Sequence, residues 1–192
     1  MRPEHQAGYP LLTATLRDGR SVRLRPLSAA DAGALGDFYT SLPRETWRFY
    51  CPPCLTREDA ARRAAEADAA TVVCLVAEEP SSRAIVGYAW YRWKDDASSP
   101  GPRSSTFGIC LREAYRGAGL GHALIARLLE IAREVGPPVM ALTVQLANPR
   151  AIALYQKMGF RIVRQQVRDR IGDFAAEPEY AMEQIVREPN TT

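Results

Sequence analysis

The chain has 192 residues, the length of one domain or at most two small ones, and 46% of them are hydrophobic, as in an ordinary globular protein. Its 25 basic and 22 acidic residues are mixed along the sequence and give a net charge of +3. No basic run typical of nucleic-acid binding is present, the apolar stretches are too short to span a bilayer, and the N-terminus lacks the apolar core of a signal peptide. We therefore expect a cytoplasmic protein that has neither nucleic acid nor a membrane as a partner.

The first half of the chain alternates between strand and helix patterns. Residues 1–20 show neither and are expected to be a flexible tail. Residues 21–25 alternate like a strand, and a helical segment over 31–50, capped by Ser28 or Asp31, follows. The next predicted elements are a helix opened by a capping box of Thr56 and Asp59, and strands over 71–77, 84–94 and 105–111.

The second half opens with an amphipathic helix, because apolar residues recur at helical spacing over 121–135. After it come a buried strand over 139–146, a short helix through Met158, and two antiparallel strands over 160–168 and 180–186. Asn148 as the N-cap and Gly159 beyond the end agree on the bounds of the short helix. No repeat or linker divides these elements, so a single α/β domain is predicted over 21–187, with a tail at 188–192.

The cysteines raise the question of a metal site or a disulfide. Residues 51–54 (CPPC) have the spacing of either, but His5 and His122 do not form a second ligand pair for zinc. A redox dithiol is expected at a helix start after a strand, whereas this motif lies between two predicted helices. We predict inert thiols in a turn, no metal, and core positions for Cys74 and Cys110.

Residues 115–121 (YRGAGLG) place three glycines at alternate positions directly before a helix. A strand, a glycine-rich turn and a helix together form an anion site, because the first helical N–H groups lack partners and the helix dipole is positive there. The loop lacks the Lys-Ser/Thr end of a Walker A motif, and Gly117, Gly119 and Gly121 do not have the spacing of a dinucleotide fingerprint. By themselves the glycines are equally compatible with a tight strand-to-helix turn.

The sequence from Arg116 to Gly121, together with Asn148-x6-Tyr155-x3-Gly159, resembles the GNAT family of N-acetyltransferases. The acetyl-CoA loop of that family reads Arg/Gln-x-x-Gly-x-Gly/Ala, and the resemblance covers about residues 22–186. It implies an α/β fold with a mixed, mostly antiparallel central sheet that splays between its fourth and fifth strands, flanked by about four helices.

The resemblance also implies an activity. An acetyl group passes from acetyl-CoA to a primary amine by direct attack, with no metal and no enzyme nucleophile. The acceptor is a small molecule or a protein lysine, and residues 22–52 resemble the start of bacterial protein-lysine acetyltransferase domains, which slightly favours lysine. Relatives often form homodimers. The alternative is a non-catalytic module that binds acyl-CoA.

The family pattern assigns roles to residues of this sequence. Tyr155 matches a tyrosine held near the CoA sulfur as the general acid, Asn148 matches a partner of the CoA arm, and a strand N–H near Ile109 matches the oxyanion donor. Arg112 is a candidate for supporting the charge of Arg116. The expected cofactor-binding residues are Ile109, Cys110, Leu111, Arg116, Gly117, Ala118, Gly119, Leu120, Gly121, Asn148 and Tyr155.

One position departs from the family pattern. Many relatives have a general-base glutamate where this chain has Thr106, and a threonine is not a useful base at neutral pH. Candidate replacements are Glu45, Glu179 and Glu183, a water relay, or an acceptor that arrives neutral. The acceptor cleft is expected between residues 31–53 and 168–183, which contain Trp47, Phe49, Tyr50, Asp173, Phe174 and Tyr180; simple packing is the alternative role for these six.

Overall fold

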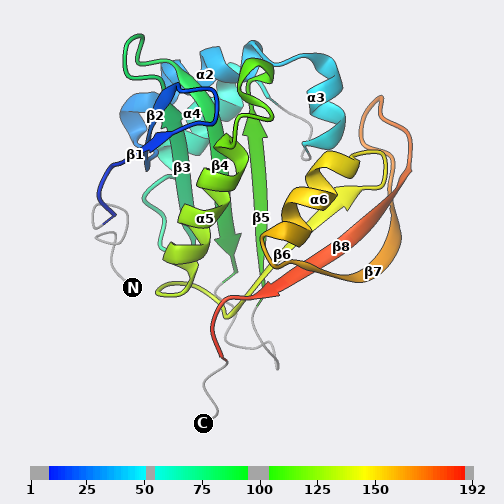
Figure 1. The fold of residues 1–192 in the computed structure, drawn as a ribbon. Helices are drawn as coiled ribbons and strands as arrows, with labels where there is room; N and C mark the ends of the chain where they lie inside the picture. Colours follow the sequence, from blue (N-terminus) through cyan, green and yellow to red (C-terminus); the bar gives the residue numbers. More distant parts are fainter. Residues whose placement is uncertain (1–8, 51–54, 95–103, 189–192) are drawn as a thin grey trace.

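The computed structural model describes residues 9–50, 55–94 and 104–188 (Figure 1). These residues form one sheet with the strand order β1-β2-β3-β4-β5-β6-β8-β7. Its strands are β1 (Leu12–Thr15), β2 (Ser21–Pro26), β3 (Val72–Glu78), β4 (Ile85–Trp93), β5 (Ser104–Leu111), β6 (Val139–Gln145), β7 (Arg161–Arg168) and β8 (Glu177–Ile185). The helices are α2 (Ala32–Thr40), α3 (Arg44–Phe49), α4 (Arg57–Ala65), α5 (Leu120–Ala132) and α6 (Pro149–Lys157), with short 3-10 turns η1 (Ala29–Asp31) and η2 (Glu113–Tyr115).

The sheet is antiparallel except where β5 meets β6. These two strands run parallel and pair over only three residues each, the last pair being Thr106 with Ala141. Beyond that pair the strands diverge, and β5 continues to Leu111 with β4 as its strand partner. The fourth and fifth strands of the prediction are β5 and β6, because β1 is not among the predicted strands. The predicted splay between them is therefore confirmed, as is the mixed, mostly antiparallel sheet.

Helices cover both faces of the sheet (Figure 1). On one face, α5 buries Leu124, Ile125 and Leu128 against the sheet in a core that also contains Tyr155 of α6. On the other face, α2 and α4 enclose a second core. Residues 72–77 of β3 form a continuous apolar run, because every residue of this strand is buried between the two layers; the last one, Glu78, is charged.

The N-terminal helical segment differs from its prediction. The single segment expected over 31–50 is two helices, because Pro43 disfavours helical backbone at the residue before it and then serves as the N-cap of α3. The chain consequently has five α-helices in its described part, one more than expected. The helix α5 also ends at Ala132, three residues before the predicted end.

The N-terminal segment is the second difference. Residues 12–15, expected in a flexible tail, form β1, which pairs antiparallel with β2 at the edge of the sheet. Its apolar pattern is weak because Leu12 is 45% exposed, so a short edge strand of this kind has little periodicity to detect. The ordered fold thus begins before residue 21.

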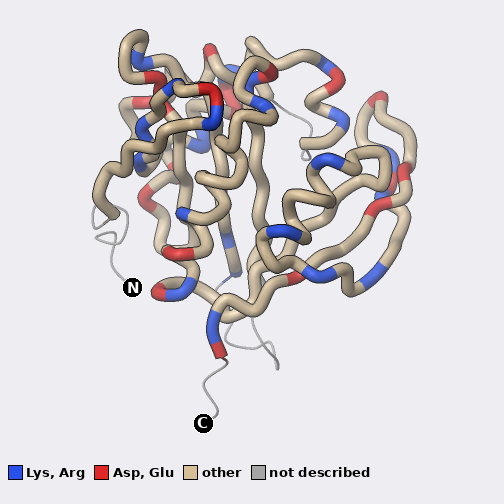
Figure 2. Tube along the Cα trace, viewed as in Figure 1, with Lys and Arg blue, Asp and Glu red and all other residues tan. Residues whose placement is uncertain are grey.

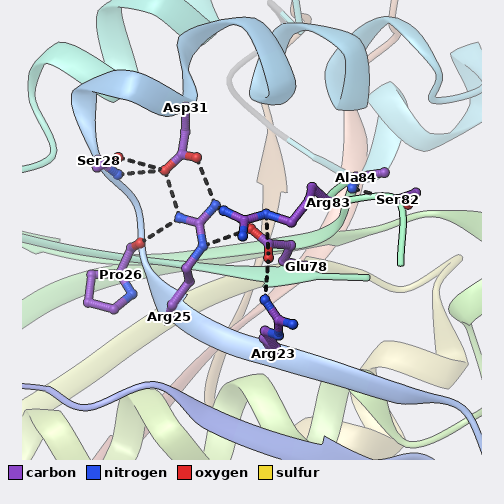
Figure 3. A network of polar contacts seen from close by, with 9 residues as sticks. All are labelled: Arg23, Arg25, Pro26, Ser28, Asp31, Glu78, Ser82, Arg83 and Ala84. Carbon is purple, nitrogen blue, oxygen red and sulfur yellow. Dashed lines mark hydrogen bonds and ion pairs between the residues drawn. The ribbon is translucent and has the colours of Figure 1, made fainter. Parts of the chain in front are cut away.

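A network of charged side chains fastens β2 to β3 and to η1 (Figure 3). The guanidinium of Arg25 donates to both carboxylate oxygens of Asp31 at 2.8 Å and to Glu78 at 2.8 and 3.0 Å. Glu78 is 1% exposed and also pairs with Arg23 and Arg83. Its burial is compatible with its charge because three arginines surround it.

Candidate active site

A pocket of about 360 Å³ lies where β5 and β6 diverge. Its walls are the glycine loop with the start of α5, the ends of β5 and β6, the start of α6, and α3. Most of the expected cofactor-binding residues line it: Ile109, Cys110, Leu111, Arg116, Gly117, Gly119, Gly121, Asn148 and Tyr155. Four parts of the chain that are separate in the sequence, at residues 17, 46–50, 109–122 and 143–157, thus meet at one pocket.

Two expected residues do not line the pocket. The side chains of Ala118 and Leu120 are buried in the core on the α5 side of the sheet, and Leu120 is fully inaccessible. The carbonyl of Ala118 accepts a hydrogen bond from the backbone N–H of Arg17 at 2.9 Å. These two positions alternate with the glycines and point their side chains away from the pocket that the glycines border.

The glycines of the loop have distinct structural reasons. Gly117 and Gly119 have φ values of +81° and +98°, which disfavour any side chain, and Gly119 is the N-cap of α5. Gly121 has ordinary backbone, but a Cβ there would lie 3.1 Å from Leu154 of α6. The loop therefore needs glycine at two positions for its conformation, and at the third glycine allows close packing of α5 against α6.

Arg116 of the glycine loop contacts α3, another wall of the pocket. Its Nη2 donates to the hydroxyl of Thr46 on α3 at 2.7 Å and lies 3.5 Å from the carbonyl oxygen of Leu111. Arg112, considered as its support, is not part of the pocket wall. The structure adds four basic residues that the sequence interpretation missed: Arg17, His122, Arg150 and Lys157. His122, Arg150 and Lys157 each lie one or two positions after a motif residue in the sequence. Arg17, in contrast, comes from the segment predicted as a tail.

Tyr155 lies at the bottom of the pocket in an aromatic cluster. Its ring meets Phe107 and Phe160 edge-on, each with the ring centroids 5.9 Å apart. Its hydroxyl makes no hydrogen bond to another residue in the described ranges. Burial, and to a smaller degree the neighbouring Cys110, raise the pKa of the Tyr155 phenol, so it stays protonated at neutral pH.

Cys110 is a buried free thiol in the same pocket. Burial raises its pKa to about 12, against a small opposing effect of Arg116. The thiol is therefore inert as a nucleophile at neutral pH. Cys74, likewise buried, is the second predicted core cysteine that the structure confirms, whereas the CPPC motif falls outside the described residues.

Asn148 begins α6 at the pocket rim. Its side-chain oxygen accepts a hydrogen bond from the backbone N–H of Ala151 at 3.2 Å, which confirms the predicted N-cap. Pro149 occupies the first turn, as predicted. Because the capping bond uses only the side-chain oxygen, the amide NH₂ is available for a ligand in the pocket.

The candidate bases lie apart from this pocket. Thr106 is exposed at the last β5–β6 pair, and Glu45 is exposed on α3. Glu179 on β8 is 3% exposed, with one oxygen accepting from Gln166 at 2.7 Å and the other without a hydrogen-bond partner among the described residues. Glu183 is half-buried on the same strand. In the part of the chain that the structure describes, no Asp or Glu lines the pocket.

The expected acceptor residues divide between two places. Phe49 and Tyr50 line the main pocket, and the Tyr50 hydroxyl accepts from the indole N–H of Trp90 at 2.7 Å. A second, surface pocket between α3 and the β7–β8 connection is lined by Arg44, Trp47, Ile171, Gly172, Asp173 and Phe174. Tyr180 packs against the core instead.

Three contacts join α3 to the β7–β8 hairpin. Arg44 pairs with Asp173 at 2.7 Å, Arg48 pairs with Glu177 at 2.5 Å, and an Arg168 guanidinium nitrogen donates to the carbonyl of Arg48 at 2.9 Å. The hairpin therefore closes one side of the expected acceptor cleft. The Arg44–Asp173 pair contributes little to this attachment because both side chains are exposed to water. The contacts that are better shielded from water contribute more.

Charges elsewhere are mixed over the molecule, with Lys and Arg interspersed among Asp and Glu (Figure 2). Among the described residues, no group of His, Cys, Asp and Glu is arranged to hold a metal ion. No described helix combines the length and the apolar character that crossing a membrane requires.

Residues 37–160 match the model of the Acetyltransferase (GNAT) family, and the chain belongs to this family. The family resemblance of the sequence is thereby confirmed. Two solved structures share the fold: the GNAT domain of S. lividans PAT, with a TM-score of 0.70 and 23% identity, covers 92% of this chain and 98% of its own. The structure of yncA from Salmonella typhimurium with its cofactor acetyl-CoA has a TM-score of 0.74 and 20% identity, covering 89% and 97%.

Curated relatives are also acyltransferases by name. A mycothiol acetyltransferase of Propionibacterium freudenreichii is 29% identical over 113 residues, which are 59% of this chain and 35% of that protein. The L-amino acid N-acyltransferase MnaT of Escherichia coli is 29% identical over 148 residues, 75% of this chain and 82% of that protein. An uncharacterized N-acetyltransferase of Bacillus subtilis, YdgE, is 34% identical over 86 residues, 45% and 54%. The matched part thus spans only about a third to a half of the first and third of these relatives.

Proposed function

We propose that this protein is an N-acetyltransferase that moves an acetyl group from acetyl-CoA to a primary amine by direct attack. The observation that carries the proposal is the pocket at the β5–β6 divergence, where a glycine loop, an unpaired strand edge and the buried Tyr155 face one space. Bound acetyl-CoA would supply the activated thioester. Every other requirement of the reaction falls to residues of this chain.

The pocket residues fit the elongated shape and the negative charge of acetyl-CoA. The backbone N–H groups at the start of α5 can bind a diphosphate, because helix N-termini attract anions. At Gly117 and Gly119 a Cβ would strain the backbone or stand between these N–H groups and the diphosphate. Past Thr106, the edge of β5 toward β6 has no strand partner among the described residues, so its N–H and C=O groups can pair with an amide-bearing arm. The Ile109 region then offers backbone donors to a thioester carbonyl, as in other acyl-transfer sites.

Tyr155 acts in the proposal as the proton donor to the departing sulfur. A phenol with a raised pKa is a weak acid, so the transfer needs a sulfur that is itself strongly basic. Burial raises the pKa of the Cys110 thiol to about 12 in this pocket. A CoA thiolate shielded from water there would likewise become more basic, which favours proton transfer from Tyr155.

No carboxylate of the described residues lines the pocket to serve as the general base. Glu179 is the strongest candidate of the three, since it is buried and one of its oxygens has no hydrogen-bond partner among the described residues. Its proposed route to the amine is a water, because it does not line the pocket. That no carboxylate lines the described pocket also supports the alternative function, a module that binds acyl-CoA without turnover.

We propose a small or slender amine as the acceptor. The contacts of Arg44, Arg48 and Arg168 with the β7–β8 hairpin narrow the acceptor side, which opposes entry of a folded protein surface. The names of relatives include acetyltransferases for L-methionine sulfoximine and an N-acyltransferase for L-amino acids. Amino acids and their analogues are therefore the first acceptors to test, with polyamines, aminoglycosides and lysine peptides as the comparison set.

The deciding experiment mixes the protein with acetyl-CoA and each acceptor, follows thiol release, and identifies the acetylated product by mass. The proposal expects turnover with at least one amine and none without protein. Tight CoA binding with no turnover on any acceptor would replace the enzyme by the binding module. Absence of both binding and turnover would reject the two functions together.

A further inference from the structure

The turn between β1 and β2 rests on the glycine loop. The backbone N–H of Arg17 donates to the Ala118 carbonyl at 2.9 Å, and Nη2 of Arg20 donates to the Ala114 carbonyl at 2.7 Å. The Arg20 guanidinium also lies 3.9 Å above the ring of Tyr115. A segment about a hundred residues away in the sequence is thus fastened to the start and the middle of the loop.

This attachment brings one arginine to the mouth of the pocket. A Cβ on Gly119 would lie 3.7 Å from Cγ and 3.9 Å from Nε of Arg17. On the other side of the loop, Nη2 of Arg150 is 2.8 Å from the position of a Cβ on Gly117. Both arginines line the pocket, so two guanidinium groups flank the two left-handed glycines.

Among the described residues, no acidic side chain compensates the charge of these two arginines. Within residues 9–50, 55–94 and 104–188, neither Arg17 nor Arg150 forms an ion pair, whereas Arg20 in the same turn pairs with Asp18 at 2.6 Å. The described pocket wall contains further positive charge at Arg116 and Lys157 and no carboxylate. Several cations without a counter-charge repel one another, and a multivalent anion relieves that repulsion.

We propose that Arg17 and Arg150 form a phosphate subsite for the nucleotide end of the acyl donor. This inference rests on the proposed function and narrows its donor class. The N-terminus of α5 offers only about half a unit of positive charge, whereas the nucleotide end of CoA carries a diphosphate and a 3′-phosphate. The two arginines add two full positive charges, so the protein selects donors that carry the phosphorylated nucleotide over acyl-pantetheine alone.

The test compares the wild-type protein with Arg17→Gln and Arg150→Gln. For each, the Kd of CoA is measured by calorimetry, and kcat/KM is measured with acetyl-CoA, acetyl-dephospho-CoA and S-acetylpantetheine. Each substitution is expected to weaken CoA binding about tenfold, the loss typical of one hydrogen-bonded charge, and to leave kcat/KM with S-acetylpantetheine unchanged. Arg17→Lys keeps the charge without the fork and should lose less than Arg17→Gln.

The matched control is Arg57→Gln, which changes the net charge equally. Arg57 pairs with Asp37 at 2.6 Å and lies outside the pocket wall. The control should bind CoA as the wild type does, and all variants should unfold within a few degrees of the wild type.

The outcomes separate this inference from the function on which it rests. Wild-type CoA affinity in both variants overturns the subsite and leaves the donor assignment standing, and so does an equal loss with S-acetylpantetheine, which would indicate a change in the fold. A wild-type protein that binds no CoA rejects the donor assignment itself. A tenfold loss supports the subsite whichever phosphate is bound: if it persists with dephospho-CoA the diphosphate is the ligand, and if it disappears the 3′-phosphate is.

Discussion

The ring of Phe107 on β5 stands at 89° to the ring of Tyr155 on α6, with the centroids 5.9 Å apart. This edge-on contact holds the phenol by its ring and leaves its hydroxyl free of any hydrogen bond to the described residues. The position of the hydroxyl is therefore set by packing, and its chemistry can be removed without disturbing its support.

Replacing Tyr155 by Phe separates these two contributions. The ring contacts with Phe107 and Phe160 persist, so we expect the free energy of unfolding to change by less than about 1 kcal/mol. The kcat should fall about 100-fold, the lower end of what a positioned acid contributes. Thiol release under saturating donor measures the effect, and an unchanged kcat would remove Tyr155 from the proton-transfer role.

The pH dependence follows from the same residue. An ordinary tyrosine loses its proton near pH 10, but burial raises the pKa of Tyr155 in the folded protein. The acid form therefore persists through pH 10, and kcat should show no fall that depends on Tyr155 up to that pH. The comparison is the kcat profile of the wild type against Tyr155→Phe, and an alkaline fall below pH 10 present only in the wild type would contradict it.

Gly119→Ala tests the loop. The substitution forces a side chain into a left-handed backbone, which costs about 1–2 kcal/mol of stability, and it should also weaken CoA binding because the α5 N–H groups shift. Gly33→Ala is the matched control, since Gly33 lies in α2 with ordinary backbone and open space, and it should stabilise the protein by about 0.5–1 kcal/mol. Thermal unfolding and CoA titration of both variants supply the comparison.

Gly108→Ala tests the packing between β5 and β4 beside the pocket, where Gly108 pairs with Trp90. A Cβ at Gly108 would lie 2.6 Å from the indole carbons of Trp90, so the indole must move and release the Tyr50 hydroxyl that it holds. We expect a loss of about 1–3 kcal/mol from overpacking together with a weaker CoA affinity. Stability comparable to the wild type would show that the indole can shift freely.

Asp31→Asn tests the charged network of β2 and η1. Burial opposes ionisation of this carboxyl, but the hydrogen bonds from Arg25 and Ser28 prevail and lower its pKa. A lowered pKa in the folded state stabilises the protein above the unfolded value, about pH 4, and this stabilisation disappears as the pH falls further. The variant should therefore be less stable than the wild type at pH 7 and approach it near pH 3, as followed by chemical unfolding at both pH values.

The sequence predicts most of this fold because its signals are strong and local. The amphipathic pattern of α5 and the Asn148 and Gly159 boundaries of α6 belong to short windows, and the family resemblance supplies the mixed sheet and its splay. Failures occur where the determinant is distant or weak. The strand β1 carries little periodicity, and Arg17 reaches the pocket only because a backbone hydrogen bond attaches its turn to Ala118.

The site is predicted less completely than the fold for the same reason. Local spacing places the glycines and Tyr155 at one pocket, but it cannot show that Ala118 and Leu120 turn inward. It also cannot say where the carboxylates go. The burial of Glu179 depends on how β8 pairs with β6, which no short motif encodes.

The divergence of β5 and β6 has a consequence for how the protein behaves in a crowded solution. An unpaired strand edge is the usual route by which sheets add strands from other chains. Here such an edge lies inside the molecule, beside the wall that α5, α6 and α3 form around it. A slender arm with amide groups can reach the edge through this pocket, whereas a second polypeptide that added a strand would have to pass between these helices. The fold thus combines a strand edge open to hydrogen bonding with protection against aggregation through that edge.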